Sequence, residues 1–117
     1  MNLRELFDRI KAAVDSDPVL QDAIETRIIL GIPTEHPAIY VDGIYDLDDV
    51  KTGDAIYFNV NLTYAKTTGS LADAEAFFDL AGRLKAALPQ HGIVGGSWLD
   101  RSGETVHRAL FNCQTRL

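Results

Sequence analysis

The chain has 117 residues, the length of one ordinary domain, and its apolar and charged fractions of 46% and 24% exclude wholesale disorder. Its net charge is −6 and its basic residues are scattered, which argues against nucleic acid as the main partner because phosphate neutralisation needs clustered Lys and Arg. No apolar run approaches the roughly 20 residues of a membrane-spanning helix. We expect one domain over residues 1–117, with no membrane partner and no specific nucleic-acid binding.

The compartment follows from the N-terminus and from cysteine usage. The first residues are amphipathic and lack the apolar stretch of a secretory signal. The single cysteine, Cys113, excludes an internal disulfide framework. We therefore expect a reducing, cytoplasmic environment.

Two helices are predicted at the start of the chain. Apolar residues at helical spacing predict the first over 3–14. Asp17 and Pro18 are typical of a cap followed by the first helical residue, and they predict a short second helix through Ile24.

The next segment is less regular. Residues 27–30 fit either a short strand or the end of the second helix, and residues 38–41 predict a strand rich in β-formers. Asp42 and Gly43 predict a turn, and residues 44–53 an acidic, irregular stretch.

The strongest strand signal lies in residues 55–65, where apolar and polar side chains alternate. One face carries Ile56, Phe58, Val60, Leu62 and Tyr64, and the other carries Tyr57, Asn59, Asn61 and Thr63. At about 3.3 Å per residue such a strand runs roughly 35 Å, which is long for so small a domain. Either it bends, or part of it pairs beyond the compact body.

A long helix is predicted next, capped by Ser70 and ended by Pro89. Its expected apolar stripe is Leu71, Ala74, Phe77, Phe78, Ala81, Leu84 and Leu88.

The chain ends in a predicted hairpin. Residues 92–99 form a strand loosened by Gly95 and Gly96, and residues 104–115 form the last strand, with His107, Ala109, Phe111 and Cys113 on one face. These elements predict an α+β fold: a four-stranded, mostly antiparallel sheet packed against helices, in the order α-(α)-β-β-α-β-β.

Residues able to carry chemistry are dispersed. The histidines, His36, His91 and His107, lack metal-motif spacing, and His107 stands about 20 Å from Cys113 along an extended strand, too far for a thiol–imidazole pair. The acids Asp42, Asp46, Asp48, Asp49 and Asp54 lack the glycine and the closing glutamate of an EF-hand loop.

Glycine and serine motifs are equally uninformative. The segment 92–96 is not a phosphate loop, since neither Lys-Ser nor Lys-Thr follows it, and its glycines indicate a bulge or a bend in a strand. No serine lies in a Gly-x-Ser-x-Gly elbow. We expect a protein that is not an enzyme, without catalytic, cofactor-binding or metal-binding residues.

The polar side of the long strand is the better candidate for a functional surface. Its uncharged residues are Tyr57, Asn59, Asn61 and Thr63, and the last strand adds Asn112 and Gln114. Such a face fits equally a surface covered by another subunit and a plain solvent-exposed side of the sheet. The acidic residues Asp46, Asp48 and Asp49 are best interpreted as solvated loop carboxylates. The next interpretation is a second candidate surface, for docking a partner.

The order of elements resembles the tail terminator, or tail-completion, proteins (minor tail proteins) of long-tailed bacteriophages and related particles. The resemblance rests on the opening helix with Leu6 and Ile10, the strand at 37–41, the long strand at 57–62, the helix at 74–88 and the closing strand pair. It covers most of the chain and is one of order, length and pattern, because the family has no invariant catalytic motif.

The resemblance implies a structural virion protein. Such a protein is expected to form a homo-oligomer, a hexameric ring that caps the tail tube and meets the head-side connector. The implied partners are a tail-tube protein and a head–tail connector protein, the implied location is the virion tail after assembly in the host cytoplasm, and no cofactor is implied.

Two other interpretations stay open. One is a non-catalytic α+β adaptor or chaperone-like binding module. The other is a small enzyme with a scattered site, which a deep pocket joining His36 or His91 to the acids of residues 42–54 would favour.

Overall fold

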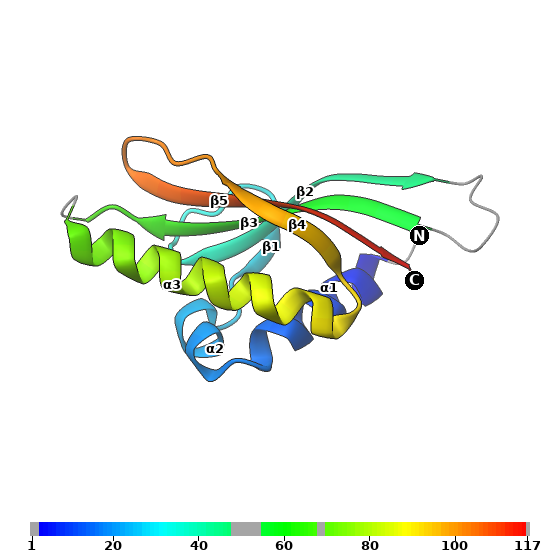
Figure 1. Cartoon of the computed structure of the whole chain (residues 1–117). Coiled ribbons are helices and arrows are strands. Elements are labelled where there is room, and N and C mark those ends of the chain that lie inside the picture. Colours follow the sequence, from blue (N-terminus) through cyan, green and yellow to red (C-terminus); the bar gives the residue numbers. More distant parts are fainter. Residues whose placement is uncertain (1–2, 48–54, 68–69, 117) are drawn as a thin grey trace.

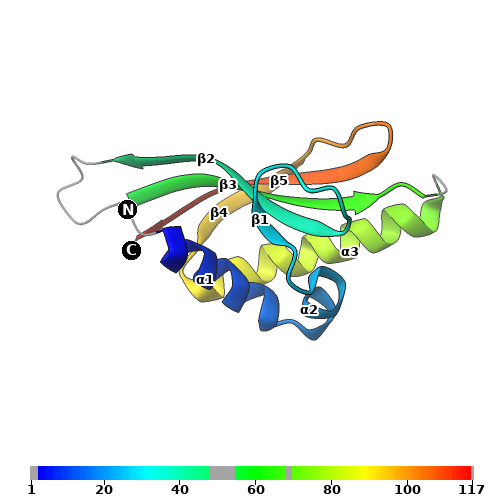
Figure 2. The same cartoon turned by 180° about the vertical axis from the view of Figure 1, so that it is seen from behind.

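The computed structural model describes residues 3–47, 55–67 and 70–116, which form a sheet with every helix on one face (Figures 1 and 2). The helices are α1 (Leu3–Asp15), α2 (Pro18–Ile24) and α3 (Leu71–Ala87), and a 3-10 turn, η1 (Leu88–His91), follows α3. The strands are β1 (Ile28–Leu30), β2 (Ala38–Leu47), β3 (Ala55–Ala65), β4 (Val94–Asp100) and β5 (Val106–Arg116).

The described residues form a sheet of five strands in the order β1-β2-β3-β5-β4. β1 pairs with β2 in parallel and the other three pairings are antiparallel, so the predicted α+β class and mostly antiparallel sheet are confirmed. The predicted number of four strands is wrong. The extra strand is β1, because the backbone of residues 28–30 pairs with residues 39–41 of β2.

The two N-terminal helices form as predicted. Leu6, Ile10 and Val14 of α1 are fully buried at helical spacing. The Asp17 carboxylate accepts hydrogen bonds from the backbone N–H groups of Val19 and Leu20, which satisfies donors that an α-helix leaves free in its first turn.

Helix α3 begins at the predicted cap, where Ser70 Oγ accepts a hydrogen bond from the Asp73 amide. Its stripe is only partly as predicted: the buried residues are Phe77, Leu80, Ala81, Leu84 and Ala87. Leu71 and Phe78 are 76% and 53% exposed. The Phe78 ring lies 5.4 Å from the ring of Trp98, on the rim of the helix–sheet contact and not beneath the sheet.

Asp42 and Gly43 do not form the predicted turn. β2 continues through them to Leu47, with one extra residue on β2 between the pairs Asp42–Asn59 and Tyr45–Tyr57. This β-bulge places Gly43 at a φ of 60°, a left-handed conformation that glycine adopts without strain. Residues 42–47 therefore lengthen the sheet, and residues 48–53 of the predicted irregular stretch lie outside the described residues.

β3 is the longest-paired strand of the sheet, with β2 on one side and β5 on the other. All of its 11 residues have a partner on β5, and Ile56, Phe58, Val60 and Leu62 are buried against the helices, which confirms the predicted alternation. The length of β3 is thus used for pairing with its own sheet. Where β2 and β3 approach residues 47 and 55, they extend past the end of α1 (Figures 1 and 2).

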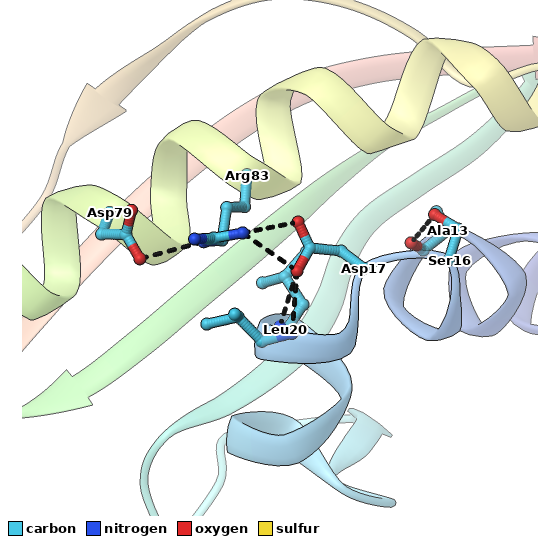
Figure 3. A network of polar contacts seen from close by, with 7 residues as sticks. Ala13, Ser16, Asp17, Leu20, Asp79 and Arg83 are labelled. Carbon is cyan, nitrogen blue, oxygen red and sulfur yellow. Dashed lines mark hydrogen bonds and ion pairs between the residues drawn. The ribbon is translucent and has the colours of Figure 1, made fainter.

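An ion-pair network joins the corner between α1 and α2 to α3 (Figure 3). The Arg83 guanidinium donates to both Asp17 carboxylate oxygens at 3.2 and 3.3 Å and to Asp79 at 3.0 Å. Partial burial of Asp17 tends to raise its pKa, but hydrogen bonds from Leu20, Arg83 and Val19 together lower the pKa below the ordinary value of 3.8.

We predict that Asp17→Ala lowers the free energy of unfolding by about 1 kcal/mol at neutral pH, because it removes a helix cap. Since the pKa of Asp17 is lower in the folded state, its contribution is present above pH 3.8 and is lost as pH falls through the folded-state pKa. Urea denaturation at neutral pH and below pH 3.8 measures the free energy of unfolding of the variant and the wild type. The difference between the two should be smaller in acid. Asp79→Ala, which removes only an exposed pair with Arg83, should cost a few tenths of a kcal/mol; an equal loss in both variants would contradict the role of the cap.

A second prediction concerns the bulge in β2. A Cβ atom at Gly43 would lie 2.7 Å from Asn59 Nδ2 and would also oppose the left-handed backbone, so Gly43→Ala should destabilise the protein by about 1–2 kcal/mol. The matched control is Gly82→Ala within α3, where nothing lies within 4 Å of a new Cβ atom and alanine should stabilise by roughly 0.5–1 kcal/mol. Thermal and urea unfolding of both variants measures the opposite signs.

Candidate interface on the open face of the sheet

The sheet face turned away from the helices contains the polar residues singled out in the sequence. In register, Asn59 of β3 faces Asn112 of β5, and Tyr57 faces Gln114. Side chains of directly opposed residues lie on the same face of a sheet, so these four form one continuous surface. We call Tyr57, Asn59, Asn112 and Gln114 the outer patch.

Asn61 and Thr63 belong to the same strand face but are not accessible. They are 0% and 3% exposed. Thr63 Oγ1 donates to the Ala38 carbonyl and lies 2.7 Å from His36 Nδ1, while Asn61 Nδ2 donates to Asp42 Oδ1 at 3.0 Å. His36, in the segment between β1 and β2, lies against Thr63, so this half of the face is closed within the chain. Among the described residues, Asn61 Oδ1 is buried without a hydrogen-bond partner.

The outer patch occupies the other half of the face. Asn112 and Gln114 are exposed, and Tyr57 and Asn59 are half-buried. Tyr57 and Gln114 line a depression of about 400 Å³, and both also line an adjoining depression of about 380 Å³ that includes Asn112. The amide and hydroxyl groups of the outer patch thus border two depressions, whose linings also include Val94 and, in the larger one, Arg9 and Arg116.

Arg9 supports one edge of the larger depression, a role that the sequence did not reveal. Its guanidinium donates to Thr115 Oγ1 at 2.8 Å and to the Arg116 carbonyl at 2.6 Å, and Thr115 Oγ1 donates to the Gly92 carbonyl at 2.7 Å. These bonds join α1, the end of β5 and the start of β4. No spacing signal connects residues separated by more than 100 positions, so only the fold identifies this contact.

The predicted acidic surface is described only in part. Asp46 lies in β2, where its backbone pairs with Ile56 of β3. Asp48, Asp49 and Asp54 lie outside the described residues. Asp42 is exposed, and its carboxylate accepts the hydrogen bond from Asn61.

The histidines occupy three separate places. His36 lies beside Thr63, His91 Nδ1 lies 3.2 Å from the Ala87 carbonyl, and the His107 ring stacks on Phe77 with centroids 4.9 Å apart. A depression that includes Asp42 has no histidine among its described lining residues. Within residues 3–47, 55–67 and 70–116, no group of three or more His, Cys, Asp or Glu can hold a metal ion.

The glycine-rich segment forms the predicted bulge. The register of β4 against β5 shifts between Gly95 and Trp98, and a Cβ atom at Gly95 would lie 2.8 Å from the Asn112 carbonyl oxygen. Glycine is needed there because the two backbones approach closely.

Comparisons with known proteins show the fold. No protein-family model matches the chain, and no curated protein matches it. A chain in a solved structure of the virion of a native gene transfer agent particle is similar to it, with a TM-score of 0.56 and 14% sequence identity over 95% of this chain and 92% of that chain. The likeness therefore spans nearly the whole of both chains. No helix among the described residues is long and apolar enough to cross a membrane.

Cys113 lies on the inner face of β5, where burial raises the pKa of its thiol to about 12. We predict that a maleimide at neutral pH leaves Cys113 unmodified in the folded protein and modifies it fully in denaturant. Mass spectrometry of the two samples measures this difference. Rapid modification of the folded protein would show that the end of the sheet opens readily.

Proposed function

We propose that this chain is a structural protein of a phage-like particle and acts as a tail terminator: a hexameric ring that caps the tail tube and joins it to the head-side connector. Its main support is the likeness of fold, over nearly the full length, to a chain in the virion of a gene transfer agent particle. The order of elements in the sequence resembles the same class of protein.

The outer patch gives the proposal a surface. An uncharged polar strand face with tyrosine, half-open and hollowed, suits contact with another protein better than it suits permanent exposure to solvent. Asn112 and Gln114 present amide donors and acceptors that pair with a partner backbone without the desolvation cost of a charge. We assign this patch to contact with the tube or the connector.

A binding module remains the second candidate because the depression beside Tyr57 and Gln114, at about 400 Å³, is large enough for the side chains of a bound peptide. Such an adaptor or chaperone-like module would work as a monomer or dimer. A ring that caps a tube would have a larger mass and a different geometry, so the two candidates are separated by one measurement.

We predict a particle of near six times the 12.9 kDa chain mass, in solution or after mixing with a tail-tube protein of the same particle. Size-exclusion chromatography with light scattering gives the mass, and electron microscopy shows rings at tube ends. A monomer that binds no tube protein would contradict the proposal. A stable dimer that binds a peptide would favour the binding module.

The outer patch is tested by variants that keep the fold. Asn112→Glu with Gln114→Glu adds two charges to exposed positions and should reduce binding to tubes at least tenfold, with unchanged thermal unfolding. The matched control, Gln21→Glu, makes the same chemical change on the exposed side of α2 and should bind as wild type. Equal binding by both variants would remove the outer patch from the interface.

A further inference from the structure

One side of β2 is an open strand edge. β1 pairs only with residues 39–41 of β2, so the described part of the chain places no strand beside residues 42–47 on that side. Alternate residues of a strand direct their backbone N–H and C=O groups to each side, and an open edge leaves one set without strand partners. This stretch is therefore a vacant position for one more strand.

Exposed apolar side chains stand beside that vacant position. Leu30, the last residue of β1, is 61% exposed, and Ile32, just after the strand, is 86% exposed. They line, with Val41, Asp42 and Ile44, a groove of about 360 Å³ along β2. A strand placed in the groove would bury the side chains of Leu30 and Ile32. It would also form hydrogen bonds with the backbone N–H and C=O groups at the open edge of β2.

The opposite side of the sheet ends in a second open edge, β4. Its strand neighbour among the described residues is β5 alone. Val94 and Leu99 of β4 are 57% and 44% exposed, and Phe78 of α3 lies against Trp98 with half of its surface in solvent. β4 thus matches β2: an unpaired backbone edge bordered by exposed apolar groups.

The two edges differ in charge. β2 contains two carboxylates, Asp42 and Asp46, and no basic residue. β4 contains one carboxylate, Asp100 at its end, which accepts a hydrogen bond from the Ser102 amide. Two basic residues border the strand, since Lys85 shares a small depression with Gly95 and Arg101 follows the end of the strand. Pairing β2 with another β2 would bring carboxylates together. Residues 94–99 of β4 carry no acidic side chain, so pairing β2 with that part of β4 avoids the repulsion and sets β2 beside an edge bordered by Lys85 and Arg101.

We propose that the β2 edge of one copy pairs with the β4 edge of the next, so that a single sheet continues from subunit to subunit. Contact between two different edges of the same chain is head-to-tail, and head-to-tail contacts close into rings when the rotation permits. The proposal rests on the ring-forming function above and names the surfaces that build it. The outer patch then stays free for the tube or the connector.

Cross-linking between two variants, each with one introduced cysteine, tests the pairing. Asp42→Cys reports on the β2 edge and Ser97→Cys on the β4 edge, both exposed, in full-length protein that keeps the buried Cys113. A short bismaleimide applied to a mixture of the two variants should give covalent dimers, and neither variant alone should give them. Ile32→Cys, almost fully exposed beside the groove, replaces Asp42→Cys if that variant unfolds.

The matched control is Asp22→Cys on the exposed side of α2, which should not cross-link to either reporter. The yield of the mixed dimer should fall several-fold from low to high salt, because salt screens the charges beside the two edges. A protein carrying both Asp42→Cys and Ser97→Cys should give a ladder that ends at the ring.

The outcomes separate this proposal from the proposed function. Rings in light scattering without mixed cross-links would overturn edge pairing and leave the terminator function standing. Dimers within one variant alone would overturn the head-to-tail arrangement. No ring, no tube binding and no cross-link would overturn both.

Discussion

The structure depends on β3, a strand of 11 residues that is paired along its whole length with β5 and flanked on its other side by β2. Because side chains of a strand alternate, this one element sets two surfaces at once. Its apolar face, from Ile56 to Leu62, forms the floor on which the helices pack. Its other face offers uncharged polar groups on a surface that no helix covers (Figure 2).

Polar groups on that second face are treated in two ways. Near Thr63 the chain satisfies them itself, through His36 and the Ala38 carbonyl. At the other end of the face, the side chains of Asn112 and Gln114 are exposed. The contact between His36 and Thr63 depends on the segment that connects β1 to β2. Parallel pairing of β1 with β2 holds the two ends of that segment in place. The shortest strand of the sheet thus determines how much of the longest strand remains available for contact.

Local patterns predicted the elements that depend on local physics. Both capped helices, the alternation in β3 and the bulge near Gly95 were predicted because caps, periodicity and glycine act within a few residues. The errors involve distant contacts. β1 exists only through its pairing with β2. Phe78 fits the apolar stripe, but it lies at the side of the helix–sheet contact, beside Trp98, with half of its surface exposed.

Open strand edges are a hazard for a soluble protein, since any exposed edge can pair with another. Here each edge contains a bulge at a glycine, near Gly43 in β2 and near Gly95 in β4, and bulges interrupt regular pairing. Asp42 adds charge to one of the edges. A flat, uncharged strand would pair poorly with such an edge, because the bulge interrupts the ladder and the charge would lose its hydration. A strand that is itself bent and carries complementary charge would pair with it more readily. The same features that discourage aggregation would suit the selective contact between unlike edges that we propose for the ring.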